Sequence, residues 1–164
     1  MATPPLAESL ALAKARGDDP ARCGFELSRH ILLGIKDARA HRPDLCLKYG
    51  EYLLRTHSSS LSHEVWAAYE QVYVALLQKA RCTARAAAAG NSVEGEDMHK
   101  AQEFLSKLSA QFPDSLRVKR LEGMMSESKG DYDRAMADYD DILAEDPSNL
   151  LAIKRQVSSS HGRD

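Results

Sequence analysis

Residues 116–149 read LRVKRLEGMMSESKGDYDRAMADYDDILAEDPSN, and this stretch decides the fold. Apolar residues recur at the spacing of an α-helix on both sides of Gly130, which interrupts the pattern. Ser115 and Asp131 stand where the two helices would start, and such side chains can cap free backbone N–H groups. The second helix must end before Pro147, because proline cannot continue a helix interior. The stretch therefore predicts two antiparallel helices joined by a tight turn.

A period of 34 residues connects this stretch with the segment before it. The positions that recur are Ala101, Leu105 and Pro113, followed by Ala135, Tyr139 and Pro147. The tetratricopeptide repeat has this length and the order Gly, Ala-x3-aromatic, Pro. Its small residues lie where the two helices cross closely, and its aromatic residue fills the space beside the crossing. The residues that define the repeat here are Gly123, Gly130, Tyr132, Ala135, Tyr139 and Pro147.

The predicted fold class is all-α, since no segment sustains the period of two that a strand requires. We expect a tetratricopeptide α-solenoid of antiparallel helix pairs that is incomplete at its C-terminal end. An unrelated helical bundle is the alternative. In the upstream copy the helix containing Trp66 has to take the first position, because residues 82–97 are rich in Ala and Gly. We expect the 82–97 stretch to be an inserted loop.

A chain of 164 residues corresponds to one domain. Pro, Gly and Asp residues in 1–21 predict a flexible N-terminal arm. The helical repeat domain should cover 22–157, with its clearest repeat at 116–149, and a polar tail should follow at 158–164. Within this domain we expect Ser62 to cap the helix that contains the tryptophan.

The composition excludes several classes of protein. The chain has 22 Lys and Arg against 24 Asp and Glu, a net charge of −2, whereas proteins that bind nucleic acid usually carry a basic excess. Its apolar runs are much shorter than the about 20 residues that cross a membrane. The N-terminal residues lack the pattern of a signal or transit peptide. We therefore expect no membrane span and a location in the cytosol or on the cytosolic face of a membrane.

No pattern of residues predicts a catalytic, cofactor-binding or metal site. The 3 Cys and 6 His residues have neither C-x-x-C nor H-E-x-x-H spacing. Glycine-rich phosphate loops and the G-x-S-x-G pattern do not occur either. We expect the chain not to be an enzyme and to need no cofactor.

Four segments of the chain resemble a known family. They read EVWAAYEQV at 64–72, QFPDS at 111–115, RVKRLEGM at 117–124 and YDDILAEDPSN at 139–149. These segments are similar to a family of tetratricopeptide subunits of the endoplasmic reticulum membrane protein complex, and the resemblance extends over about 44–157.

The resemblance implies a non-enzymatic scaffold, peripheral on the cytosolic side of the endoplasmic reticulum membrane. Its implied partners are the other subunits of that complex, which supports the insertion of tail-anchored and multi-pass membrane proteins. No nucleic acid or small-molecule substrate is implied. The family continues through further repeats, whereas here Leu150, Ile153 and Val157 begin a helix without a second one after it. We therefore expect a truncated product or fragment, or an end that a partner covers.

Arg117, Lys119 and Arg120 are the candidate partner-binding residues. The first helices of such repeats line a concave face, where a basic cluster can bind an acidic segment. The alternative is a solvated polar face, because Lys and Arg are common at exposed helix positions. A competing function is a tetratricopeptide co-chaperone adaptor that binds the C-terminal peptide of a chaperone. Arg120 suits that function, but Met124 stands where the adaptor's clamp is expected to have Asn.

Overall fold

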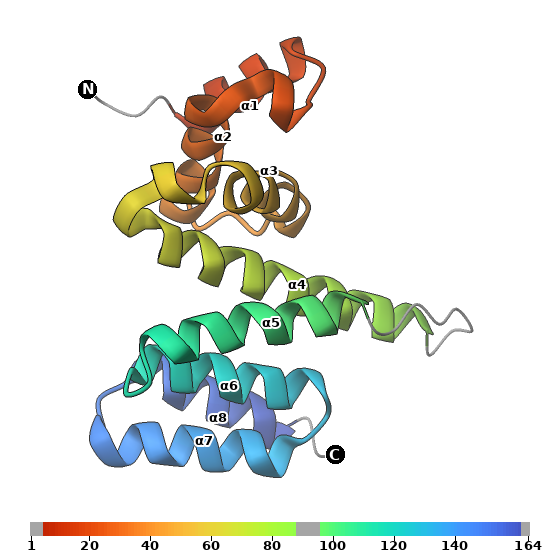
Figure 1. Ribbon diagram of the computed structural model, residues 1–164. Coiled ribbons are helices and arrows are strands. Elements are labelled where there is room, and N and C mark those ends of the chain that lie inside the picture. Colours follow the sequence, from red (N-terminus) through yellow and green to blue (C-terminus); the bar gives the residue numbers. More distant parts are fainter. Residues whose placement is uncertain (1–4, 88–95, 162–164) are drawn as a thin grey trace. The chain divides into compact units, whose positions relative to one another are not determined.

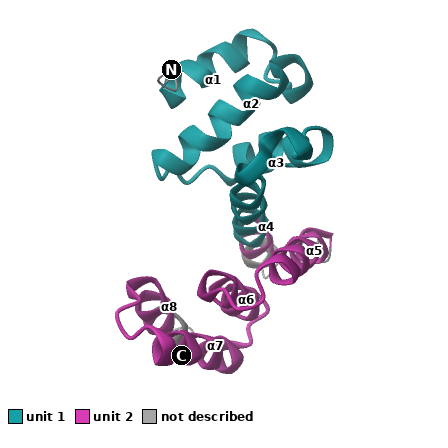
Figure 2. Cartoon of the chain, turned by 60° about the vertical axis from the view of Figure 1, so that its left-hand side comes forward, with its two compact units in different colours: residues 1–78 teal, residues 79–164 magenta. Residues whose placement is uncertain are grey.

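The computed structural model describes residues 5–87 and 96–161. These residues form eight α-helices and one 3₁₀-helix without a strand, which confirms the all-α prediction. The chain divides into two compact units, unit 1 (residues 1–78) and unit 2 (residues 79–164), coloured separately in Figure 2. The elements are α1 (Leu6–Ala15), α2 (Pro20–Asp37), α3 (Pro43–Thr56), η1 (Ser58–Glu64), α4 (Val65–Ala87), α5 (Glu96–Gln111), α6 (Leu116–Ser128), α7 (Tyr132–Glu145) and α8 (Leu150–His161).

The N-terminal stretch 1–21, expected to be a flexible arm, contains the helix α1. This helix packs against α2, and its Ser9 and Ala13 are fully buried. Directly after α1, the side chain of Arg16 donates to the carbonyl oxygen of Cys23 at 3.0 Å. The expectation relied on Pro, Gly and Asp residues, but these stand at the two ends of α1, where a helix tolerates them.

The helix α2 has a defined start and an internal kink. It begins with Pro20 in its first turn, and the Asp19 carboxylate caps it by accepting from the Ala21 N–H at 3.0 Å. Gly24 interrupts the helical backbone with φ +75°, a conformation that side chains rarely allow. Beyond the kink the helix buries an apolar stripe of Leu27, Ile31, Leu32 and Ile35.

A second glycine brings α3 and α4 close together in unit 1. A Cβ atom on Gly50 would lie 2.4 Å from Cγ2 of Val72, so a side chain at this position would force the helices apart. Ser62 does not cap α4, which corrects the prediction from the sequence. It lies inside the 3₁₀-helix with φ +48°, because the serine-rich segment makes tight turns of its own before α4 begins.

The expected inserted loop at 82–97 is helical at both of its described ends. The helix α4 continues into it, as its alanines favour, and α5 begins before it ends. Lys79 of α4 forms an ion pair with Asp97 of α5 at 3.0 Å. Residues 88–95 lie outside the described residues.

In unit 2, α6 and α7 lie antiparallel at the positions that the sequence predicts (Figure 1). Gly130 makes the turn between them with φ +79°, and the Asp131 carboxylate caps α7 by accepting from the Arg134 N–H at 3.2 Å. Ser115 stands at the start of α6, but its hydroxyl makes no capping hydrogen bond. Its backbone carbonyl accepts from the first turn of α6 instead.

The helix α8 packs on α7 and completes the core of this part of unit 2. The core consists of Ala135, Tyr139, Ile142 and Ala152, with Leu116 and Leu143 packed against it. The helix α8 extends to His161, so the segment expected to be a polar tail, 158–164, begins inside this helix. Residues 162–164 lie outside the described residues.

Candidate interaction surface

Gly123, Ala135 and Tyr139, three of the residues predicted to define the repeat, lie where α6 crosses α7. A Cβ atom on Gly123 would lie 2.7 Å from Cε1 of Tyr139, so the two helices touch through the tyrosine ring. Tyr139 and Ala135 are fully buried. Gly130 lies in the turn before α7, and Tyr132 is the first residue of α7. The remaining repeat positions, buried on α5 or following the ends of α5 and α7, are Ala101, Leu105, Pro113 and Pro147.

A buried carboxylate lies beside this crossing. The side chain of Glu127, near the end of α6, is only 6% exposed. It accepts hydrogen bonds from the Tyr139 hydroxyl at 2.8 Å and from Nη1 of Arg155, on α8, at 3.0 Å. Burial and the neighbouring Glu127 charge hold the pKa of Tyr139 far above its ordinary value. Because a buried charge is costly unless it is paired, these contacts tie α8 to α6 and α7.

Sequence reasoning missed this buried cluster. Glu127 follows Gly123 by one helical turn, so it lies on the face of α6 that packs against α7. An acidic residue on a packed face needs a partner, and that was the available signal. The partner on α8 could not be identified, because Arg155 belongs to a helix for which no complete repeat defines the position.

The three candidate basic residues of α6 have different surroundings. Arg117 is exposed, and Lys119 and Arg120 are half-buried. Lys119 forms an ion pair with Glu145 at the end of α7, and the hydrogen bond between them raises the pKa of the lysine. Glu145 therefore holds the Lys119 side chain at the end of α7.

The two arginines line a cleft of about 360 Å³ between α6 and the start of α8. Its lining residues are Leu116, Arg117, Arg120, Asn149 and Leu151. The Asn149 side chain caps α8 by accepting from the Ala152 N–H at 3.2 Å, which fixes this end of the cleft. The arrangement combines two cationic groups with apolar walls, and this combination suits the binding of a polypeptide.

The helix α8 exposes apolar side chains beside this cleft. Leu150 is 69% exposed, Leu151 54% and Val157 53%, and Ile153 is 37% exposed. Among the α8 residues whose side chains the structure describes, Ala152 is the one that is fully buried. Leu150, Ile153 and Val157 follow one another at i, i+3 and i+7 and share one side of the helix, whereas Leu151 lies about 160° around the helix from Ile153.

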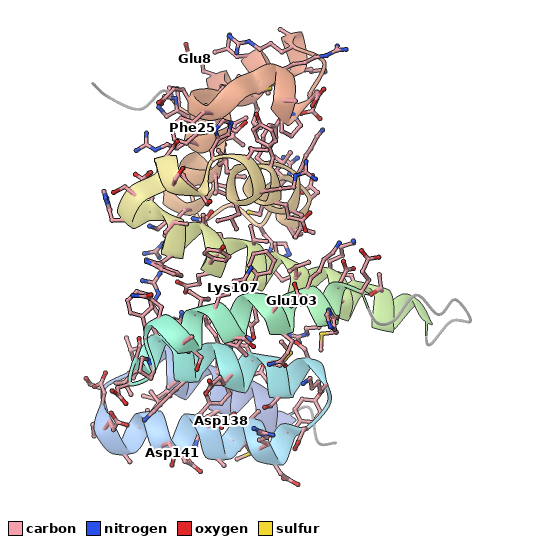
Figure 3. All side chains as sticks on the ribbon, in the orientation of Figure 1. Glu8, Phe25, Glu103, Lys107, Asp138 and Asp141 are labelled. Carbon is pink, nitrogen blue, oxygen red and sulfur yellow. The ribbon has the colours of Figure 1, made fainter. Side chains whose placement is uncertain are left out.

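A second and more polar cleft, of about 510 Å³, lies where α5, α6 and α7 meet. Within it, Glu122 accepts from the Ser109 hydroxyl at 3.3 Å, and Asp138 accepts from the Ser126 hydroxyl at 3.4 Å. Burial raises the pKa of Asp138. Figure 3 labels Asp138 on α7 toward α6, whereas Asp141 is exposed.

Among the side chains that the structure describes, no three His, Cys, Asp or Glu residues are placed to hold a metal ion. None of the helices within residues 5–87 and 96–161 is long and apolar enough to cross a membrane.

Comparison with known proteins extends these observations. The chain is 38% identical over 112 residues to ER membrane protein complex subunit 2 of Xenopus tropicalis, an overlap of 68% of the chain. The chain is a sequence relative of ER membrane protein complex subunit 2. Subunit 2-B of Xenopus laevis is also 38% identical, over 109 residues and 66% of the chain. Subunit 2 of Dictyostelium discoideum is 27% identical over 139 residues and 84% of the chain.

These overlaps cover 32%, 31% and 38% of the three proteins, so the chain spans about a third of the length of the curated relatives it matches. No protein-family model matches the chain. The relatives confirm the resemblance that the four quoted segments indicated.

Proposed function

We propose that this chain acts as a non-enzymatic scaffold in the endoplasmic reticulum membrane protein complex, in the manner of its subunit 2. The observation that carries the proposal is the 38% identity over 112 residues to subunit 2 of Xenopus tropicalis. The shared stretch amounts to 32% of that protein, so the proposal concerns the surfaces that this stretch supplies.

The architecture proposed for this role is a tetratricopeptide α-solenoid. The 34-residue period supports it, and so does the close approach of Gly123 to Tyr139 in the clearest repeat. Helices that end just before Pro113 and Pro147 support it as well. Stacked helix pairs of this kind form extended surfaces on which several partners can assemble.

The proposed partners are the other subunits of the complex, on the cytosolic side of the endoplasmic reticulum membrane. In this proposal the chain is peripheral and supports the insertion of tail-anchored and multi-pass membrane proteins. It does so by binding proteins, without chemistry, cofactor or nucleic acid of its own.

Arg117, Lys119 and Arg120 are the proposed partner contacts. Arg117 and Arg120 offer positive charge at a cleft with apolar walls, whereas Lys119 acts through its ion pair with Glu145. For the co-chaperone adaptor, the position expected to hold Asn carries Met124, which is buried. No observation on the described residues favours that alternative.

The proposal is tested by expressing the tagged chain in cells, recovering it under mild detergent and identifying the associated proteins. We expect the other subunits of the membrane protein complex. The variant Arg117→Glu/Arg120→Glu should recover them at least about tenfold less well, because the charge at the cleft is reversed. The matched control Lys14→Glu/Arg55→Glu reverses the same number of positive charges, at exposed positions in unit 1, and should leave the recovery unchanged.

Two results would contradict the scaffold function. One is a folded, well-expressed chain that recovers no subunit of the complex. The other is recovery of a chaperone in place of those subunits, with the loss of that chaperone in the variant Arg120→Ala, which would support the adaptor.

A further inference from the structure

The polar cleft of unit 2 contains two carboxylates whose charge is only partly compensated. Glu122 of α6 and Asp138 of α7 line this cleft of about 510 Å³, and both are half-buried. Among the described residues, neither carboxylate takes part in an ion pair. Each accepts from one serine hydroxyl, at 3.3 Å from Ser109 and at 3.4 Å from Ser126. Both carboxylates have therefore lost part of their hydration without gaining strong donors from the protein.

Ser126 connects the two acidic residues but cannot satisfy the acceptors around it. The residue is 7% exposed, and its hydroxyl lies 3.4 Å from Oδ2 of Asp138 and 3.3 Å from the backbone carbonyl oxygen of Glu122. A hydroxyl has one proton, so it can donate to only one of these acceptors at a time. Its oxygen can also accept, and no described residue donates to it. The cleft therefore offers several hydrogen-bond acceptors to a group that enters it.

The arginine nearest to Asp138 does not compensate it fully. Arg134 precedes Asp138 by one turn of α7, and its charge favours the ionised carboxylate. However, Arg134 is exposed and forms no ion pair with Asp138. The effect of burial is larger than that of the arginine, so the pKa of Asp138 is raised. The ionised carboxylate therefore lacks a close cation of its own.

The opposite end of the cleft has a different character. Lys129 follows Glu122 by seven residues, about 10 Å along the axis of α6, and donates to the amide oxygen of Gln102 at 3.3 Å. Asp131 at this end caps α7. Between the two ends, the buried side chain of Leu105 lines the cleft. The cleft thus runs from two acidic groups past an apolar wall to a lysine with a neutral partner.

We propose that the polar cleft binds an arginine side chain of a partner protein, whose guanidinium lies between Glu122 and Asp138 and also donates to Ser126. The inference deepens the proposed scaffold function and rests on it for the existence of such a partner. A guanidinium suits these acceptors better than an ammonium, because its planar fork of five N–H groups serves several acceptors at once and is more weakly hydrated. An acidic residue of the same segment complements Lys129.

The raised pKa of Asp138 supports the site and also makes it testable. Because burial disfavours the ionised carboxylate, its charge lowers the stability of the chain, and a bound guanidinium relieves this effect. Charged groups that lower stability are common in binding sites. Asp138→Asn should therefore remove binding without weakening the fold, which separates the two roles.

The test uses three six-residue peptides with blocked ends that differ at one position, which holds arginine, citrulline or lysine. Each peptide has a glutamate three residues later, about 10 Å away in an extended chain. Citrulline has the shape of arginine without its charge. Binding to the full chain is followed by the NMR shifts of the backbone amides in α5, α6 and α7. We expect the arginine peptide to bind at least about tenfold more tightly than the citrulline peptide and about threefold more tightly than the lysine peptide.

Two conservative variants test the proposed contacts. Glu122→Gln and Asp138→Asn should each weaken the binding of the arginine peptide by about fivefold or more, and both should reduce its advantage over the citrulline peptide. The matched control is Glu103→Gln, which removes a negative charge at an exposed position of α5 outside the cleft and should leave binding unchanged (Figure 3). Urea denaturation checks that Asp138→Asn is at least as stable as the parent chain.

The same residues are then tested in cells. The tagged variant Glu122→Gln/Asp138→Asn should recover at least one subunit of the membrane protein complex about fivefold less well than the parent chain, whereas Glu103→Gln should recover all of them equally. Unchanged recovery of every subunit by the double variant would overturn the inference.

Two results with the peptides would also overturn it. One is the absence of a saturable shift below about 10 mM arginine peptide, and the other is equal binding of the arginine and citrulline peptides. If the chain still recovers the subunits of the complex in these cases, the scaffold function stands and only this inference fails. Arginine-specific binding by a chain that recovers no subunit would have the opposite meaning: the cleft would be confirmed as an arginine site and the scaffold function contradicted.

Discussion

Each unit of the molecule contains a fully buried tyrosine whose hydroxyl donates to a carboxylate, but the two carboxylates lie in opposite environments. In unit 1, Tyr49 donates to Asp18 at 2.6 Å, and the Asp18 side chain is 50% exposed. In unit 2, Tyr139 donates to Glu127 at 2.8 Å, and the Glu127 side chain is 6% exposed. The tyrosines are alike, so the difference between the two pairs comes from the acceptor.

The same hydrogen bond therefore contributes differently to stability, depending on whether water reaches the carboxylate that accepts it. Asp18 also binds Lys48 at 2.6 Å and remains solvated, so it keeps its charge stabilised if the tyrosine hydroxyl is lost. Glu127 depends on protein donors, because a buried carboxylate that loses one is left partly unsatisfied. Unit 1 therefore uses its pair to fasten a turn, whereas unit 2 uses its pair to hold three helices together.

The largest effect is expected at the helix crossing beside Tyr139, where no solvent can relieve a clash. Gly123→Val should lower the free energy of unfolding of unit 2 by about 3 kcal/mol, because even the Cβ atom would lie 2.7 Å from the tyrosine ring. Urea denaturation measures the loss, and hydrogen exchange of the amides in α6 and α7 assigns it to unit 2.

The matched control is Ala137→Val, an exposed position on α7, with an expected loss of only about 0.5 kcal/mol from helix propensity. Gly50→Val in unit 1 should be about as damaging as Gly123→Val, since its Cβ atom would lie 2.4 Å from Val72. Equal, small losses at Gly123 and Ala137 would mean that the crossing of α6 and α7 is not tight.

The next largest loss of stability is expected when either tyrosine hydroxyl is removed. Tyr139→Phe should cost about 2 kcal/mol of stability, because it leaves buried Glu127 without one of its donors. Tyr49→Phe should cost only about 0.5–1 kcal/mol, because water replaces the hydroxyl at Asp18. Urea denaturation of both variants at neutral pH gives the difference, with the half-buried Tyr52→Phe as the control. Identical losses at the two sites would remove the distinction between the two units.

A smaller change in the free energy of unfolding is expected in unit 1 when the pH is lowered. In unit 1, Arg29 binds Glu64 through Nε–Oε2 at 2.5 Å and Nη2–Oε1 at 2.6 Å, and these hydrogen bonds hold the pKa of Glu64 below its ordinary value. Since the folded pKa is lowered, the stabilisation is present above the ordinary pKa and is lost as the pH falls through the folded pKa. Wild type should therefore lose about 1 kcal/mol more than Glu64→Gln between about pH 6 and pH 3.

The acid response is measured as the free energy of unfolding across that pH range, with Glu8→Gln on α1 as an exposed control. Parallel pH curves for wild type and Glu64→Gln would show that the ion pair contributes nothing.

The smallest effect has the opposite sign and belongs to unit 2. Burial raises the pKa of Asp138, so its contribution is most favourable below its ordinary pKa and is lost as the pH rises through the folded pKa. Asp138→Asn should therefore stabilise unit 2 by about 0.5 kcal/mol at neutral pH, allowing for solvent screening. Differential scanning calorimetry at several pH values should find this gain shrinking toward acid. A gain that grows toward acid would contradict the assignment.

The helices α6 and α7 could be predicted closely because local signals agreed with packing. Gly130 supplies the turn conformation and Asp131 supplies a real cap, so both helix ends depend on adjacent residues. The close crossing at Gly123 could also be anticipated, since the repeat predicted from the sequence places a small residue at a fixed distance from Ala135.

The rest of the structure depends on contacts that no local pattern encodes. The helix α1 is stabilised by packing against α2, although the Pro, Gly and Asp residues that flank it predict a flexible segment. The crossing at Gly50 lies outside the 34-residue period, so nothing in the sequence marked it as different from other glycines. The candidate surface was predicted only in part, because its arginines are visible in the sequence whereas their cleft depends on where α8 packs.

The hydrogen bonds of Glu127 restrict which substitutions this protein can accept during evolution. Its carboxylate is shared by Tyr139 and Arg155, which lie on two different helices. An apolar substitution at position 127 would leave the Arg155 guanidinium half-buried beside apolar atoms and the tyrosine hydroxyl without its acceptor. Positions 127, 139 and 155 should therefore vary together among homologues, and a lineage that replaces the glutamate by leucine should also carry phenylalanine and an uncharged residue at the other two.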